Sequence, residues 1–140
     1  MNKIILDFLS NQRVSCLTTI LKNGSPHAST LHYSHIEDPL EFYFSIESTC
    51  LKCEALLDGS TGKASMVVGF SEIEWVTLQM DGTVKAITNK IELEKIMKLH
   101  YAKHPNAEQY KNEPDTLFLK FIPTWYRYSD YKTKPLTILQ

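Results

Sequence analysis

The sequence predicts a β-rich α+β fold in which the strands curl into a barrel and the helices lie at its periphery. About seven segments have the β-branched or alternating composition of strands, and about three have helical periodicity. The strands do not alternate with helices, which argues against a doubly wound α/β sheet and favours a barrel. The length of 140 residues suits one domain, spanning residues 1–140.

Composition and charge argue against several classes of protein. Fifteen basic and sixteen acidic residues leave a formal charge of -1, so no overall field favours nucleic acid or a membrane surface. No window approaches the roughly 18 apolar residues of a membrane span. Asp7 interrupts the first apolar run, so a signal peptide is not expected. Three cysteines do not form a disulfide framework, and we expect a cytoplasmic protein.

The first half of the chain is expected to hold two helices around three strands. Asn2 can cap the first helix, and Gly59 can end the second. Asn23-Gly24 separates two β-branched runs and predicts a hairpin, because both turn positions favour positive φ. In order, we expect a helix over residues 2–10, strands over 13–21, 26–36 and 40–46, and a helix over 48–58.

The second half is expected to add four strands and one helix. Asn89 and Glu92 have the spacing of a capping box. Asp81-Gly82 fits either a hairpin turn or a bulge in one long strand, and Pro123 is expected to separate the last two strands. In order, we expect strands over 63–70 and 74–88, a helix over 89–104, a polar loop over 105–115, and strands over 116–122 and 125–131.

Hydroxyl residues gather where the strand ending at residue 46 passes into the expected helix. The first amides of a helix lack internal partners and favour an anion. Ser45, Ser48 and Thr49 add hydroxyl donors there, and Lys52 adds a cation. These residues are compatible with a phosphate cradle. Their chemistry alone favours the alternative that Ser48 or Thr49 caps the helix and Lys52 is solvated, because hydroxyl caps are common.

Cysteines and histidines offer weaker signals for redox or metal chemistry. Cys50 and Cys53 form a C-x-x-C at the expected helix start, but no βαβ pattern follows and no second C-x-x-C exists. We therefore expect neither a redox pair nor a zinc site.

The histidine spacings do not predict a metal site either. His32 and His35 lie three apart in an expected strand and face opposite sides. His100 and His104 share a helix face without the H-E-x-x-H pattern, so a structural role is preferred.

Four segments together resemble the pyridoxamine-phosphate-oxidase-like, FMN-binding split-barrel family over about residues 10–130. Their order and spacing carry the resemblance more than any one of them. They are the strand 13–20, the turn and strand 23–30, the strand and Ser…Lys run 42–52, and the segment 78–84 with its glycine. The resemblance favours a bulge over a hairpin at Gly82.

The resemblance implies a homodimer with FMN at the interface, with deazaflavin or haem as alternative ligands. His27, Ala28, Ser29 and Thr30 would line the flavin ring. Ser45, Thr49 and Lys52 would match the phosphate-binding positions. Gln79 or Thr77, which share one face of their strand, would reach the flavin, and Trp125 would cover the ring from the partner subunit.

The chain departs from the oxidases themselves at two places. Cys50 and Leu51 stand where an arginine usually accompanies the phosphate-binding lysine, and the C-terminal arginine–histidine segment that binds substrate is absent. Oxidation of vitamin B6 is therefore not expected. We expect an FMN-binding oxidoreductase of unknown small-molecule substrate, with no catalytic residue identified. The alternative is a non-catalytic protein that binds or senses flavin or haem.

Aromatic residues give a second argument for a homodimer. Large rings are enriched at protein interfaces, because they bury well while a hydroxyl still finds a partner. A barrel of this size is not expected to bury all five rings of Trp75, Trp125, Tyr126, Tyr128 and Tyr131. The alternative is that they fill the core and its rim.

Overall fold

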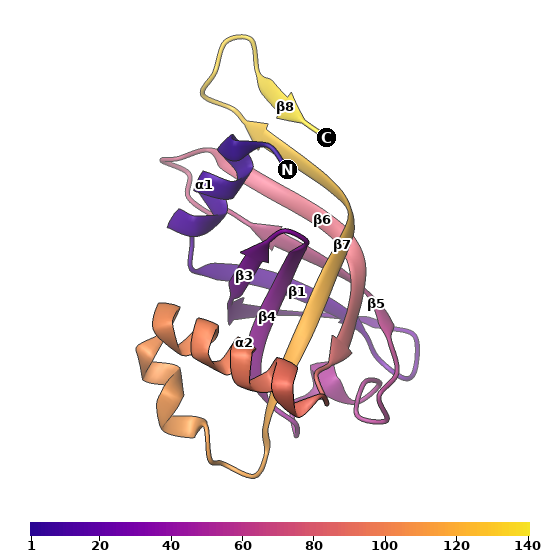
Figure 1. Ribbon diagram of the computed structural model, residues 1–140. Coiled ribbons are helices and arrows are strands. Elements are labelled where there is room, and N and C mark those ends of the chain that lie inside the picture. The colour runs from indigo at the N-terminus through magenta and orange to yellow at the C-terminus, as the bar shows by residue number, and fades with distance from the viewer.

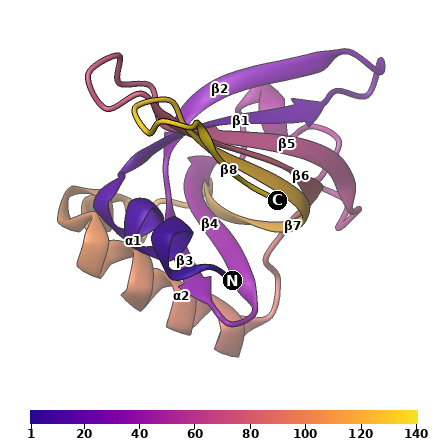
Figure 2. The same ribbon diagram turned by 90° about the horizontal axis from the view of Figure 1, so that it is seen from above.

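The strands form one antiparallel sheet that curls into a half-open barrel in the computed structural model, which describes residues 1–140 (Figures 1 and 2). The sheet order is β2-β1-β5-β6-β7-β4-β3, and β8 pairs with β7. The eight strands are β1 Val14–Ile20, β2 Pro26–His32, β3 Ser34–Glu37, β4 Leu40–Glu47, β5 Gly62–Val68, β6 Val76–Ala86, β7 Thr116–Asp130 and β8 Thr137–Leu139. The predicted β-rich split barrel is confirmed.

The barrel is split because its two end strands do not pair with each other. β2 and β3 end the sheet, and β2 approaches β4 and the 3-10 turn η1 (Leu51–Cys53) without a ladder of hydrogen bonds. One edge of β2 therefore keeps backbone groups that no strand satisfies. This gap between β2 and β4 positions the candidate site.

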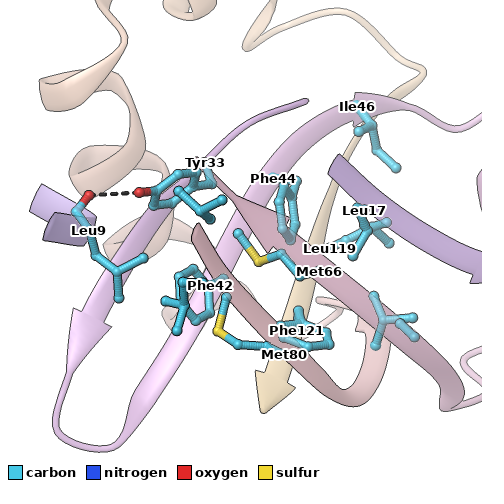
Figure 3. Close-up of a cluster of buried hydrophobic side chains, with 14 of the residues drawn as sticks. Leu9, Leu17, Tyr33, Phe42, Phe44, Ile46, Met66, Met80, Leu119 and Phe121 are labelled. Carbon is cyan, nitrogen blue, oxygen red and sulfur yellow. Dashed lines mark hydrogen bonds between the residues drawn. The ribbon is translucent and has the colours of Figure 1, made fainter. Parts of the chain in front are cut away.

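The main core fills the inside of the curled sheet (Figure 3). Alternate residues of β1 and β4, including Leu17, Phe42 and Phe44, point inward and are fully buried. The helix α1 (Lys3–Asn11) closes one end, and the Asn2 side chain caps it as predicted. Tyr33 donates its hydroxyl to the Leu9 carbonyl at 2.7 Å, so the buried ring leaves no unpaired polar atom.

The helix α2 (Lys90–Lys103) packs across the outer side of the sheet (Figure 1). A second apolar cluster lies beneath it, in which Ile96 and Tyr101 meet Tyr43 and Phe118. Asn89 accepts from the Glu92 amide at 3.0 Å, as the capping pattern predicts. Neither α1 nor α2 is long and apolar enough to cross a bilayer.

A bulge bends β6 and β7 where Gly82 lies opposite Pro123. The register shifts between Asp81 and Gly82, so the bulge is confirmed in preference to a hairpin. The sequence-based prediction that Pro123 separates two strands is wrong. Pro123 lies within the continuous strand β7, because a bulge tolerates a residue that lacks an N–H donor.

The prediction of a helix over residues 48–58 is wrong. Only η1 is helical there, and successive turns close with i to i+3 bonds such as Cys53 N to the Cys50 carbonyl, 3.0 Å. Thr19 donates its hydroxyl to the Lys52 carbonyl at 3.0 Å, and Cys53 and Leu56 are buried. Tertiary contacts therefore direct this segment into turns rather than an α-helix.

Three other boundaries differ from the prediction. Residues 26–36 do not form one strand: β2 ends at His32, and β3 lies at the opposite edge of the sheet. The expected loop over 105–115 contains the 3-10 helix η2 (Pro105–Tyr110). β8 was not predicted, because its three residues are too short to show alternation.

Candidate functional site

A polar groove lies beside the split between β2 and β4. It consists of two cavities of about 490 and 570 Å³, here called cavity 1 and cavity 2. Leu31 from β2, Ser45 from β4 and Tyr110 from η2 line both, so the cavities adjoin. Each cavity lies within the range of about 300–1,000 Å³ that is typical of ligand pockets.

The free edge of β2 runs into this groove. Thr30 and Leu31 line cavity 1. One residue earlier, Ser29 lies opposite the buried Leu17, and its hydroxyl is buried without a hydrogen-bond partner. A buried hydroxyl left unpaired costs free energy. β2 therefore carries both unpaired backbone groups and an unpaired side-chain donor beside the groove.

Cavity 2 combines one cation with three carboxylates. Lys52 lines it together with Glu47, Glu113 and Asp115. The ion pairs of the structure are Lys3–Asp7, Lys111–Glu108 and Lys120–Glu92, so the Lys52 ammonium has no carboxylate within 4.0 Å. The lysine is available to an anion, but the surrounding negative charge opposes that anion's approach.

Cavity 1 has the opposite charge character. Arg13, His32, His100 and His104 line it, and none of its twelve lining residues is acidic. His100 is 2 % exposed, and its Nδ1 lies 2.9 Å from the Ser34 hydroxyl. Burial, with the nearby cationic groups, lowers the pKa of His100 from 6.5 to about 4. Near neutral pH, Arg13 is therefore the permanent cation of this cavity.

The structure brings some of the predicted cofactor residues together and separates others. Thr30, Ser45 and Lys52 line the groove. The remaining β2 residues, His27, Ala28 and Ser29, lie on the adjoining part of the strand.

Three predicted residues do not reach the groove within one chain. Thr49 is exposed and lines neither cavity. Gln79 and Trp125 are exposed on β6 and β7, where Trp125 lies opposite Asp81, two residues from Gln79. These two share an outer face of the sheet.

The predicted phosphate cradle loses the helix N-terminus and two of its three hydroxyls, because Ser48 and Thr49 line neither cavity. Without a helix over 48–58, no helix N-terminus faces an anion. Ser45 and Lys52 remain as donors. The cradle therefore depends on side chains alone.

The C-x-x-C pair lacks the chemistry of a reactive dithiol. Both cysteines are free thiols, and Cys53 is fully buried with its Sγ 3.6 Å from the Glu47 carbonyl. Burial raises the pKa of Cys53 to about 11, which opposes thiolate formation.

Sequence reasoning missed several groove residues. Arg13 was treated only as the start of a strand, and Tyr110 as part of a polar loop. The i, i+4 spacing of His100 and His104 was visible, but their meeting with Arg13 and His32 depends on the packing of α2 against the sheet edge.

Aromatic residues are divided between core and surface. Tyr128 is buried in the barrel and Tyr126 is half-buried. Trp75, Trp125 and Tyr131 are 56 %, 43 % and 51 % exposed in the single chain. The barrel alone therefore leaves three of these five rings in contact with solvent.

The fold is that of split-barrel proteins of known structure. The conserved hypothetical protein Rv2991 from Mycobacterium tuberculosis superposes with a TM-score of 0.76 and 16% identity, over 100% of this chain and 91% of that one. HutZ, the haem storage protein from Vibrio cholerae, gives 0.74 and 14%, over 89% and 90%. A putative pyridoxamine 5'-phosphate oxidase from Listeria innocua gives 0.71 and 19%, over 90% and 95%.

A family model described as pyridoxamine 5'-phosphate oxidase matches residues 1–130. The chain belongs to this family. No curated protein sequence matches it. The identities to the solved structures are low, so these likenesses establish the fold alone.

Proposed function

We propose that the chain binds FMN in the groove between β2 and β4 and acts as a flavin-dependent oxidoreductase on a small molecule. One observation carries the proposal: the groove joins an unpaired Lys52 ammonium and the Ser45 hydroxyl to the free edge of β2. A phosphorylated ring system needs an anion-binding end and a hydrogen-bonding, partly apolar wall.

The groove residues fit the two parts of FMN to different degrees. Leu31 and Ile46 supply apolar surface for a ring, and the free edge of β2 supplies unpaired backbone hydrogen-bonding groups. Lys52 and Ser45 suit the phosphate, whereas Glu113 and Asp115 weaken its attraction. We therefore expect FMN to bind through ring contacts as much as through its phosphate.

Bound FMN would supply the electron transfer, and the chain would supply binding and orientation. β2 would fix the ring edge through backbone hydrogen bonds, and Leu31 would exclude water from one side. The groove contains no evident acid–base pair, so no protein group is assigned a proton-transfer step.

A second copy of the chain would complete the site. Trp125 and Gln79 lie on an outer sheet face that an interface would bury. A two-fold pair would bring that face of one copy toward the groove of the other copy. Trp125 would then cover the flavin ring, which a single chain leaves uncovered. We propose a homodimer on this basis.

The second candidate is a protein that binds haem or flavin without catalysis. The His32 and His100 imidazoles line cavity 1, and imidazole is a common axial ligand of haem iron. The similar structure from Vibrio cholerae is of a haem storage protein. Haem ligation through His100 would require the loss of its hydrogen bond to Ser34 or the use of its other nitrogen.

The absorbance spectrum of the protein, purified without added ligand, tests the proposal together with mass spectrometry of the released ligand. FMN supports it, and haem in place of flavin supports the second candidate. Anaerobic addition of NADH or NADPH then separates an enzyme from a binder. Bleaching of bound flavin indicates an oxidoreductase, and failure of FMN added at millimolar concentration to bind refutes the flavin proposal.

A further inference from the structure

Cavity 1 carries positive charge that no carboxylate of the chain balances. Arg13 lines the cavity, and neither it nor Lys103 has a carboxylate within 4.0 Å. The Lys103 Nζ lies 4.1 Å from the centre of the Tyr33 ring, at the C-terminal end of α2, and makes no hydrogen bond. An anion bound in cavity 1 would therefore meet one unpaired cation in its wall and a second one nearby.

The acidic residue of η2 does not oppose such an anion. Glu108 lies between the lining residues Ala107 and Gln109, but it pairs with Lys111 at 3.2 Å and lines a separate cavity with it. Cavity 2, by contrast, has three carboxylates in its wall. The two adjoining cavities therefore differ in charge, and an anionic group is favoured in cavity 1 and opposed in cavity 2.

The Arg13 guanidinium is held in place and still has free donors. Its terminal nitrogens lie 3.2 Å from the Lys103 carbonyl and 3.2 Å from Nδ1 of His104. The first contact covers a carbonyl at the C-terminal end of α2, whose partial negative charge would otherwise oppose an anion. An arginine has five N–H donors, so three remain after these two contacts. Arginine binds carboxylates through two parallel N–H bonds, and a guanidinium that is already fixed loses little freedom in doing so.

The rest of cavity 1 suits a compact organic molecule. Leu31, Pro105 and Ala107 supply apolar surface, and the volume of about 490 Å³ is that of a small-molecule pocket. Leu31 and Ser45 also line cavity 2, so a molecule held by Arg13 would lie beside a ring bound there. Cavity 1 thus combines an anion-binding end, an apolar wall and a side that adjoins the proposed flavin.

We propose that cavity 1 is the substrate pocket and that it takes a small carboxylic acid, whose carboxylate binds Arg13 and whose apolar body lies against Leu31, Pro105 and Ala107. A single guanidinium in the wall matches a singly charged carboxylate, whereas a phosphate monoester would bring about two charges toward the carboxylates of cavity 2. The role of the acid as a substrate rests on the flavin function proposed above. Its binding in cavity 1 does not.

Benzoate and benzamide are a matched pair of probes, because they share one shape and differ in charge. Near neutral pH, benzoate should bind the ligand-free protein at least about tenfold more tightly than benzamide, the factor that a hydrogen bond to a charged group supplies. Nitrogen-15 NMR measures both dissociation constants and locates the probe, because amide shifts should concentrate at Leu31 and in residues 104–110. Equal affinities, or shifts centred outside cavity 1, overturn the proposal.

Two variants isolate the guanidinium. Arg13→Gln keeps an uncharged amide that can donate to the Lys103 carbonyl, and it should bind benzoate about tenfold more weakly and benzamide about equally well. Lys95→Gln removes one positive charge from the exposed side of α2 and should keep both dissociation constants within about twofold of wild type. Undiminished benzoate binding by Arg13→Gln would refute the role of the arginine. The comparison of the two probes on the wild-type chain decides the question even if Arg13→Gln folds poorly.

Titration of benzoate into the FMN-loaded protein tests the substrate role. An acid beside the ring should shift the flavin absorbance with the same dissociation constant that NMR gives. Unshifted absorbance at saturating benzoate would show that the acid lies away from the flavin and would refute its role as a substrate.

The dissociation constant of FMN separates this assignment from the flavin function itself. Arg13→Gln should bind FMN as tightly as wild type, and a matching loss of FMN affinity would place the phosphate in cavity 1 and overturn the assignment. If benzoate binds as expected while FMN does not bind at all, the acid site is upheld and the flavin function alone fails.

Discussion

At the residue scale, the Lys52 ammonium is free to bind an anion, but neighbouring carboxylates oppose that binding. Its ammonium has no ion-pair partner, yet three carboxylates line the same cavity. We expect Lys52→Ala to weaken FMN binding by about 1.5–3 kcal/mol, the value of a hydrogen bond to a charged group. Quenching of FMN fluorescence in low salt measures this change. Lys95→Ala, an exposed substitution on α2, is the control, and an unchanged dissociation constant for Lys52→Ala would remove the lysine from the site.

The carboxylates of cavity 2 lead to a prediction of opposite sign. Glu113→Gln combined with Asp115→Asn should tighten FMN binding by up to about 1 kcal/mol for each charge removed, the size of a close pair in water. The gain should shrink as salt is added, because salt screens exposed charges. Titrations at two ionic strengths measure it. Equal or weaker binding by the double variant would indicate that the phosphate lies elsewhere.

The two cysteines of the C-x-x-C should have no redox role. Cys53 is buried with a pKa raised to about 11, so few of its thiols are ionised near neutral pH. The variant Cys50→Ala with Cys53→Ala should keep the flavin spectrum and any reductase rate within about twofold of wild type. Loss of reductase activity with flavin still bound would show that the thiols take part in catalysis.

At the scale of the elements, the bulge joining β6 and β7 depends on a glycine. A Cβ on Gly82 would lie 2.1 Å from the Ile122 carbonyl oxygen, a contact that only backbone movement can relieve. Gly82→Ala should therefore lower the free energy of unfolding by about 1–3 kcal/mol or more. Urea denaturation measures the loss.

Gly62→Ala is the matched control for this substitution. Its Cβ would meet the flexible Leu56 side chain at 3.2 Å, so a smaller loss is expected. Equal losses for the two variants would contradict a special role for the bulge.

The expected helix over residues 48–58 shows where element prediction fails. Its composition allows a helix, but Cys53 and Leu56 pack into the core, and Thr19 holds the Lys52 carbonyl. Local propensity is a weak prior that tertiary contacts override. The strands with clear alternation, such as β1 and β6, were predicted to within a few residues because burial on one face imposes that alternation.

At the scale of the whole molecule, the exposed rings predict a dimer. Trp75, Trp125 and Tyr131 remain about half exposed in one chain, and burial of such rings favours association. Light scattering at micromolar concentration should give twice the 16.1 kDa of one chain. A mass of one chain with FMN bound would refute both the dimer and a site shared between subunits.

The candidate site could be predicted only in part from the sequence. Thr30 and Ser45 line the groove because they lie near the ends of β2 and β4, and Lys52 lines it from η1, which follows β4. Arg13 and Tyr110 could not be predicted, because they are distant in sequence and meet only when α2 and η2 pack beside β2.

The sequence by itself determined the β-rich barrel and the caps of both helices, because these follow from local periodicity and backbone sterics. At Gly82 it left a hairpin and a bulge open, and the family resemblance favoured the bulge that the structure has. The tertiary structure decided the separation of β2 from β3, the turns over residues 48–58 and the meeting of His32, His100 and His104 with Arg13. Those features arise from contacts between distant segments, where packing and the pairing of buried polar groups outweigh local preference.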